Sequence, residues 1–432
     1  MRKFIITLLT TVTIVMAQSE SLTIEKSLEI GLSSSKEIQL ANSDTLISDA
    51  QVTNAWSNLL PNVTLGFNYN HLSAMPIQMN LPLPSPTGDG ALDAIYANAT
   101  IEQPLFTGFR LLSIKNASQL NKKASLLEYS KIKNGKALEI YQAFWNYSKS
   151  LKFIEVLEEN LSLIKLQMNS VQNFVKTGLA TRNEWLKLQV AKADVKSKLI
   201  DAKHQSKIAQ ASFNRVIGFK LNNNTQIDAK DANDEIAKFN FNDILTEALN
   251  SRSELLANNF RIQAADEKIT AAKSTWFPQV SAFGSYNYLK LDGSTLIIDN
   301  SNSFWMVGLG MKWSVWDWWK TSSNTTIAEE QHFQIDVANE MLKEKIEIEV
   351  YSNFLSLQSE ANKIELNKLR VESAHENFRI INDKFNSEMA TSTELSEAST
   401  LLAEAKIKLI TSSIDYKLAR IKLEKSIGRK IY

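Results

Sequence analysis

Residues 137–176 have the sequence ALEIYQAFWNYSKSLKFIEVLEENLSLIKLQMNSVQNFVK, in which apolar residues recur at helical spacing. It ends a segment that starts at Gly108, contains no proline and has one interior glycine, Gly135. Apolar residues recur in the pattern at alternating steps of four and three, with one shortened step: Ile140, Phe144, Tyr147, Leu151, Ile154, Leu157, Leu161, Ile164, Met168, Val171 and Val175. This spacing is typical of a coiled-coil seam. One helix over this segment would be roughly 100 Å long, which predicts a rod that needs neighbours along its length.

The chain contains this arrangement twice. Residues 28–63 align without gaps with residues 245–280 at an offset of 217, so that Pro61 falls on Pro278. Further along the offset is 210, and the turn TGLATRNEW (177–185) falls on SEMATSTEL (387–395). Two constant offsets indicate one internal duplication, with a seven-residue difference that lies between about residues 69 and 97 and lengthens the tip of the first hairpin.

Each repeat is expected to contain two helices, two strands, a very long helix, a turn and a second long helix. The first repeat covers residues 18–218, with strands at about 62–72 and 93–106 and long helices at about 108–176 and 181–217. A polar, Asn-rich connector follows at 219–241. The second repeat covers 242–432, with strands at about 279–290 and 303–316 and long helices at about 320–386 and 392–428.

The hydrophobic period changes from 3.6 to 2 after each of the two aligned prolines. Val63, Leu65, Phe67 and Tyr69 alternate with polar or small residues, and residues 305–315 alternate in the same way. Each strand has about 10 residues, the length that crosses a bilayer when the strand is tilted. Ordinary half-buried hairpins in a soluble protein also alternate, so the pattern alone leaves both interpretations open.

Aromatic residues favour the membrane interpretation. They cluster where strands begin and end, at the positions expected for an interfacial aromatic girdle: Trp276, Phe277, Trp313, Trp316, Trp318 and Trp319. A tryptophan cluster is more often part of a core, but next to a very long rod there is little local core to join.

Four strands cannot close a membrane barrel by themselves. Such barrels begin at about eight strands, and open sheet edges are not tolerated in lipid. Two copies would supply eight strands and close a lumen filled by side chains, whereas three copies would supply twelve and leave room for passage. The long helices also need neighbours on both sides, which a closed ring of copies would provide.

Composition and charge restrict the alternatives. The chain has 48 basic and 47 acidic residues among 432, so it lacks the basic excess of a nucleic-acid-binding protein. It contains no cysteine, which excludes disulfides, Cys-ligated metals and a lipidated N-terminal cysteine. Residues 1–17 read as a secretory signal peptide, with Arg2 and Lys3 before a short apolar core. No later run is long and apolar enough for a membrane-spanning helix.

The layout resembles the TolC-like outer-membrane efflux proteins over nearly the whole mature chain. The resemblance rests on the order, in a twofold repeat, of the boundaries LLPNV (59–63) and WFPQV (276–280), the turns KTGLATRNEW (176–185) and NSEMATSTEL (386–395), and the helix ends FNRVIG (213–218) and LEKSIG (423–428). The family has acidic pairs at its closed periplasmic end that are not evident here. In the second turn Glu388 replaces Gly178, so the turn must form without a left-handed glycine.

The resemblance implies a mainly helical protomer with a membrane β-barrel part. Three protomers would form a homotrimer with a twelve-stranded β-barrel in the outer membrane of a Gram-negative bacterium, continued into the periplasm by a twelve-helix α-barrel. The implied function is that of the outer-membrane channel in a tripartite efflux or type I secretion system. Its partners would be a periplasmic adaptor, an inner-membrane pump and outer-membrane lipid.

Two groups of residues are candidate functional sites. The turns would lie at the periplasmic tips and dock the adaptor, or they are simply short helix connections: Thr177, Gly178, Leu179, Ala180, Thr181, Glu388, Met389, Ala390, Thr391 and Ser392. Charged residues of the second very long helix would form a periplasmic gate if they face the lumen, or they are a solvated helix face: Glu372, Glu376, Arg379 and Asp383.

The sequence carries no signature of an enzyme. The four histidines are scattered, and no zinc-protease, phosphate-loop or dinucleotide motif occurs. We therefore expect no catalytic residues, cofactor or metal. Two hypotheses from different classes remain: a passive export channel gated at its periplasmic end, and a periplasmic coiled-coil scaffold or adaptor without a pore. The sequence does not indicate the cargo or the class of pump.

Overall fold

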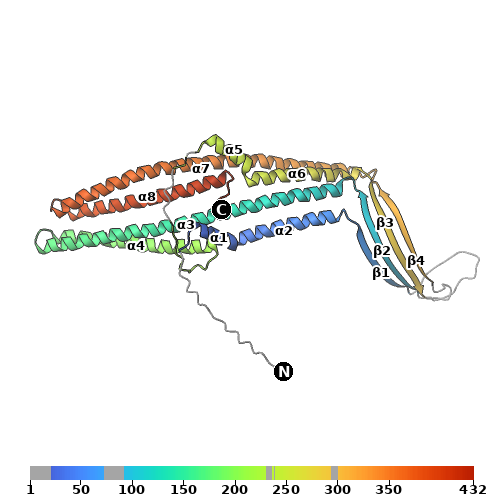
Figure 1. Cartoon of the computed structure of the whole chain (residues 1–432), viewed down its shortest axis with the longest axis horizontal. Helices are drawn as coiled ribbons and strands as arrows, with labels where there is room; N and C mark the ends of the chain where they lie inside the picture. Colours follow the sequence, from blue (N-terminus) through green and yellow to red (C-terminus); the bar gives the residue numbers. More distant parts are fainter. Residues whose placement is uncertain (1–20, 73–91, 230–235, 238, 293–299) are drawn as a thin grey trace, which may run out of the picture. The chain divides into compact units, whose positions relative to one another are not determined.

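The computed structural model describes residues 21–72, 92–229, 236–237, 239–292 and 300–432. The predicted signal peptide and the tip of the first hairpin lie outside these residues. The structure confirms a mainly helical, two-repeat fold with four antiparallel strands (Figure 1). In the described part of the chain, no helix is both long and apolar enough to cross a membrane.

The two repeats have matching element orders. The first contains α1 (Ile24–Ser34), α2 (Lys36–Ser57), β1 (Asn62–Leu72), β2 (Leu92–Phe106), α3 (Arg110–Lys176) and α4 (Arg182–Ile217). The second contains α5 (Phe241–Ser251), α6 (Ser253–Lys273), the short 3-10 helix η1 (Ser274–Trp276), β3 (Gln279–Asp292), β4 (Asn300–Lys312), α7 (Lys320–Asn386) and α8 (Ser392–Ser426). The helices α3 and α7 have the same length, 67 residues, as a duplication requires.

Contacts divide the chain into two compact units. The helical unit comprises the described residues of 1–40, 131–252 and 345–432. The strand unit comprises those of 41–130 and 253–344. Each unit therefore combines equivalent segments from both repeats.

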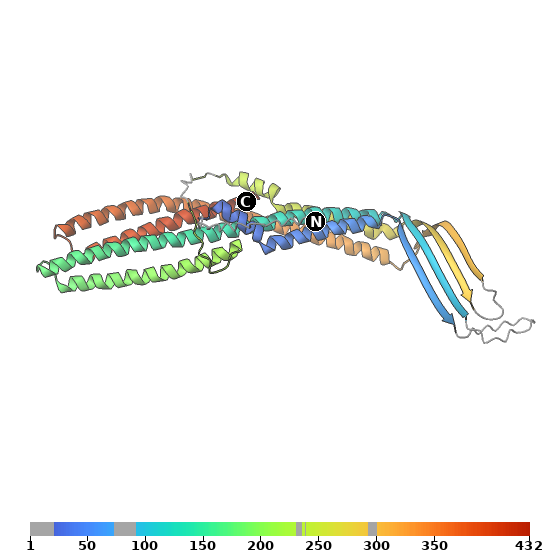
Figure 2. The ribbon, with the colours of Figure 1, turned by 60° about the horizontal axis from the view of Figure 1, so that its bottom comes forward.

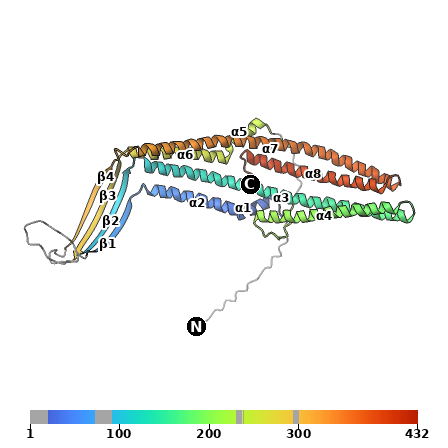
Figure 3. The same ribbon diagram turned by 180° about the vertical axis from the view of Figure 1, so that it is seen from behind.

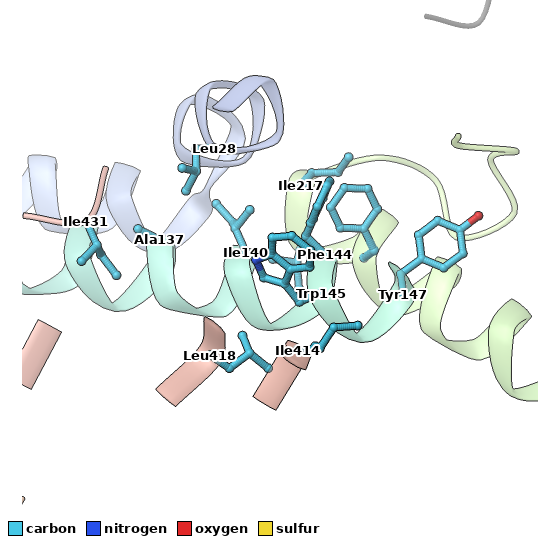
Figure 4. Close-up of a cluster of buried hydrophobic side chains, with 12 residues drawn as sticks. Leu28, Ala137, Ile140, Phe144, Trp145, Tyr147, Ile217, Ile414, Leu418 and Ile431 are labelled. Carbon is cyan, nitrogen blue, oxygen red and sulfur yellow. The ribbon is translucent and has the colours of Figure 1, made fainter. Parts of the chain in front are cut away.

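The core of the helical unit joins both repeats through α3. One buried cluster (Figure 4) contains Leu28 of α1, Ile140 and Phe144 of α3, Ile217 of α4 and Ile414 of α8. Much of the predicted seam of α3 is buried in this way, which is why a rod of this length is stable here. Further along α3 the seam residue Leu151 remains 37% exposed.

The sheet of the strand unit is a single layer with the order β1-β2-β3-β4, all antiparallel (Figure 3). Its register aligns Val63, Ile101, Gly284 and Val307 across the four strands, so they share one face. We call this the outward face; it also carries Leu65, Phe67, Tyr286, Trp305, Leu309 and Met311. These side chains are exposed, with Leu65 at 83%. A large apolar surface without cover marks an interaction surface.

The opposite face of the sheet, which we call the inner face, is mostly polar. The Tyr96 hydroxyl donates to Asn287 Oδ1 at 2.6 Å, and Asn98 and Asn287 donate to neighbouring hydroxyls on the same strands. The ring of Phe283 lies on this face over Gly308, where an added Cβ would be 2.8 Å from the ring. The two edge strands, β1 and β4, have no strand partner on their outer sides in the described chain.

Candidate functional sites: two turns, a charged helix face and two aromatic elbows

The two turns have the same backbone geometry. In the α3–α4 turn, Gly178 is left-handed with φ 78°, and Leu179 N–H donates to Phe174 O at 2.8 Å. In the α7–α8 turn, Glu388 takes the left-handed conformation itself, with φ 59°. Met389 N–H then donates to the α7 carbonyl of Lys384 at 2.7 Å. The second turn forms without glycine, as predicted, and a non-glycine residue in this conformation costs about 1–2 kcal/mol.

The turns also contact each other. They lie at the same end of the helical unit (Figure 2), and Val171, Leu188, Phe385 and Leu395 form a buried cluster between their hairpins. The rings of Phe174 and Phe385 are 5.8 Å apart. The α3–α4 and α7–α8 hairpins are therefore joined by packing near the turns.

A groove of about 450 Å³ lies between the turns. Its lining includes nine of the ten residues predicted as docking tips: Gly178, Leu179, Ala180, Thr181, Glu388, Met389, Ala390, Thr391 and Ser392. The tenth, Thr177, instead donates its hydroxyl to Asn173 O and Phe174 O of α3. Prediction from the sequence missed Phe174, Phe385, Glu184 and Glu394, which also line the groove.

The lining of the groove combines apolar and acidic side chains. Phe174, Leu179 and Met389 supply apolar surface, and Leu179 and Met389 are exposed. Glu184, Glu388 and Glu394 supply carboxylates, and the described lining contains no basic side chain. This surface suits a ligand that presents both an apolar group and a cation.

The same capping sequence is used differently in the two turns. Thr391 caps α8 and accepts from Glu394 N–H, while the Glu394 carboxylate accepts from Thr391 N–H at 2.8 Å, which completes a capping box. The bond from Thr391 N–H, followed by one that the Thr391 hydroxyl donates to the same carboxylate at 3.0 Å, holds the pKa of the Glu394 carboxyl below its ordinary value. At the equivalent position Thr181 caps α4, but the Glu184 carboxylate accepts a hydrogen bond from the Ser392 hydroxyl of the other turn.

The four predicted gate residues lie exposed on α7. Arg379 donates two hydrogen bonds to the Glu376 carboxylate, at 2.7 and 2.8 Å, and one to Asp383 at 3.0 Å. The hydrogen bonds from Arg379 lower the pKa of Glu376 and raise the pKa of Arg379. Glu372 makes no ion pair with any described residue. The equivalent positions of α3 are uncharged (Ser162, Leu166, Asn169 and Asn173), so this charged face belongs to the second repeat alone.

The six predicted interfacial aromatics lie near the elbows where strands turn into long helices. We call residues 106–110 the first elbow and residues 316–320 the second elbow. The rings of Trp316, Trp318 and Trp319 are mutually edge-on at the second elbow, and Phe277 lies against the first. Trp313 Nε1–H donates to Trp276 O at 3.2 Å. All six side chains are exposed. Within the described residues, no group of histidine and carboxylate side chains is placed to hold a metal ion.

An exposed apolar sheet face, a polar opposite face, and paired very long helices together define an outer-membrane channel protomer. The family model described as outer membrane efflux protein matches residues 30–218 and 244–429, and the chain belongs to this family. The family is one of channels and not a class of enzymes. Membership places the protein in the outer membrane of a Gram-negative bacterium.

Solved structures agree with this fold. The chain superposes on CusC with a TM-score of 0.80 at 15% identity, covering 94% of this chain and 92% of CusC. For VceC of Vibrio cholerae the TM-score is 0.78 at 14% identity, with 95% and 97% covered. For the CmeC outer membrane channel of Campylobacter jejuni it is 0.78 at 12% identity, with 94% and 85% covered. No curated protein matches the sequence.

Proposed function

We propose that three copies of this chain form a closed tube that serves as the outer-membrane conduit of a tripartite efflux or type I secretion system. The observation that carries this proposal is the sheet: its outward face is apolar and exposed, its inner face is polar, and its two edges are open. Lipid requires closure of such a sheet. Three copies give twelve strands, enough for an aqueous lumen, with the long helices continuing the tube into the periplasm.

The two faces of β1 provide the test. Leu65→Arg places a charge on the outward face, where a charge costs up to about 2–4 kcal/mol depending on its depth in the bilayer. Thr64→Arg places the same charge one residue earlier in β1, on the inner face of the sheet. We expect Leu65→Arg to abolish insertion, and Thr64→Arg to insert and to reduce cation conductance in planar bilayers.

Two results would contradict the proposal. Equal tolerance of both variants would mean that the outward face does not meet lipid. A stable monomer without conductance in purified wild-type protein would favour the alternative, a periplasmic scaffold without a pore.

The groove between the turns is the proposed docking site of a periplasmic adaptor, which in turn would contact an inner-membrane pump. Its acidic and apolar lining fits a helical tip that carries a basic and an apolar side chain. A photo-crosslinking residue at Leu179 or Met389 should capture a periplasmic protein with a helical hairpin in intact cells. The same residue at Ile200, which is exposed on α4 away from the groove, should not. Equal capture from Ile200 would argue against docking at the turns.

The proposed gate lies on the charged face of α7. Rings of charge control passage in other pores, and three copies would place three such faces around one lumen. The six aromatic residues near the elbows are proposed to lie at the depth of the membrane–water interface, where aromatic side chains are favoured.

A further inference from the structure

The first elbow is covered by a segment from the second repeat. Gly108 and Phe109 are both left-handed, with φ of 61° and 69°. A Cβ on Gly108 would lie 2.4 Å from Ser274 O, so only glycine fits there. Ser274 is 1% exposed, and the ring of Phe277 packs edge-on against Phe109 at 6.1 Å. This contact lies at the boundary between β2 and β3, where the two repeats meet within one chain.

The second elbow repeats this geometry, but among the described residues no segment covers it. Trp318 and Trp319 occupy the positions of Gly108 and Phe109 and have φ of 54° and 63°. Trp318 is 75% exposed and contacts the rings of Trp316 and Trp319. A bulky residue keeps a left-handed conformation only where its surroundings stabilise it. Within one chain, however, the rings of Trp318 and Trp319 are exposed to solvent.

The segment that would cover the second elbow exists in the first repeat. The offset of 217 relates residues 57–60 to residues 274–277. Leu60 N–H donates to Ser57 O at 3.0 Å, just as Phe277 N–H donates to Ser274 O at 3.1 Å. Ser57, however, is exposed, unlike Ser274. Residues 57–60 precede β1 and the second elbow follows β4, at opposite edges of the sheet, roughly 14 Å apart for three strand spacings.

The geometry points to a contact between copies: the three tryptophans of the second elbow pack on residues 57–60 of the next chain. This inference rests on the closed tube proposed above, in which β4 of one copy lies beside β1 of the next. The contact between copies differs from the one within the chain, because the Cβ of Trp318 would collide with a carbonyl placed as Ser274 O is placed against Gly108. The intermolecular contact is therefore wider and filled by indole rings, which commonly anchor interfaces.

Thiol crosslinking tests this contact directly, because the natural chain has no cysteine. In Ser57→Cys/Trp318→Cys, a short thiol crosslinker should give covalent oligomers up to the size of the ring. The matched control Thr53→Cys/Trp318→Cys moves one thiol a full helical turn along α2 and should remain monomeric on a denaturing gel. If the Ser57 pair yields no covalent oligomer although the variant is oligomeric in detergent, the contact is wrong and the channel proposal stands. If the wild-type protein is itself monomeric in detergent, both fail.

A second measurement separates a neighbouring copy from lipid as the partner of Trp318. Trp318→Asn keeps a residue that tolerates the left-handed conformation, so the elbow should still form. We expect it to lower the temperature at which the oligomer dissociates in detergent. Tyr286→Asn, on the outward face of the interior strand β3, should leave that temperature unchanged. If both variants leave the oligomer unchanged and weaken binding to phospholipid vesicles alike, Trp318 faces lipid and the inference is overturned.

Discussion

The hydroxyl of Ser392 donates a hydrogen bond to the carboxylate of Glu184, and this bond joins the α7–α8 turn to the α3–α4 turn. Glu184 has the sequence position of a capping-box glutamate, as its equivalent Glu394 shows. It thus has two possible partners, Ser392 of the other turn and the backbone N–H of Thr181 in its own. Separation of the turns would leave Glu184 with a local partner, so the separated state is not strongly penalised.

Ser392→Ala should therefore loosen the turns at little cost in stability. We expect a loss of under about 1 kcal/mol in the free energy of unfolding, because one hydrogen bond is removed and the Glu184 carboxylate can instead accept from the Thr181 N–H at the start of α4. On the proposed channel, open probability in single-channel recordings should rise several-fold. Ser387→Ala is the control, since the Ser387 hydroxyl donates only to Asp383 O within its own hairpin. Equal effects of the two variants would show that the bond between the turns does not restrain opening.

The capping box of α8 should depend on pH. Hydrogen bonds from Thr391 lower the pKa of Glu394 in the folded state below its ordinary value of 4.5. Its stabilising contribution is therefore fully present above pH 4.5 and is lost as pH falls through the lower, folded-state pKa. Amide exchange measured by mass spectrometry on a peptide spanning the α7–α8 turn should accelerate in that range, after correction for intrinsic rates. In Glu394→Gln the exchange should not accelerate over this pH range. If it still accelerates, the pH dependence does not come from Glu394.

The charged face of α7 should influence ion selectivity. Its four residues carry three negative charges and one positive charge, so Arg379→Gln changes the formal charge of this face from −2 to −3 in each copy. Reversal potentials measured across a KCl gradient should shift toward greater cation preference. Arg379→Lys loses the bidentate hydrogen bond to Glu376 but keeps the positive charge. Because the charge is kept, the ion selectivity of this variant should match that of the wild type. An unchanged reversal potential in Arg379→Gln would indicate that this face does not line the pathway.

Replacing either of two helical glycines by alanine should change the stability of the protein, in opposite directions for the two sites. Nothing lies within 4 Å of a Cβ built on Gly135 of α3, so Gly135→Ala should stabilise the protein by about 0.5–1 kcal/mol through helix propensity. A Cβ on Gly31 of α1 would lie 2.6 Å from Ile140 Cδ1, so Gly31→Ala should destabilise it. Thermal unfolding followed by circular dichroism measures both. A stabilising Gly31→Ala would mean that α1 packs less closely on α3 than described.

Much of the fold could be predicted because it follows local periodicity. The change of period after Pro61 coincides with the start of β1 at Asn62, and the 4-3 spacing of Ile140, Phe144 and Val171 coincides with buried positions. The exposure of Leu151 could not be predicted, because the spacing does not say which part of a seam is covered within one chain.

The groove between the turns was predictable only in part. The turn residues could be named from the duplicated sequence, but Phe174 and Phe385 join the site through contacts between hairpins more than 200 residues apart. Glu184 and Glu394 have the same local sequence pattern, so no local signal distinguishes the one that caps its helix from the one that bonds across to Ser392.

Equivalent positions of the two repeats hold Gly108 and Trp318, and this difference bears on how such a protein could have arisen. A half-length ancestor with a single repeat would have built its tube from identical contacts, and each elbow would have had to accept the same residue. After fusion of two halves, the contacts at the first and second elbows no longer had to be identical. The first could then pack tightly around a glycine, while the second acquired indole rings. On the proposed tube, duplication would thus have allowed two contacts that were once identical to differ.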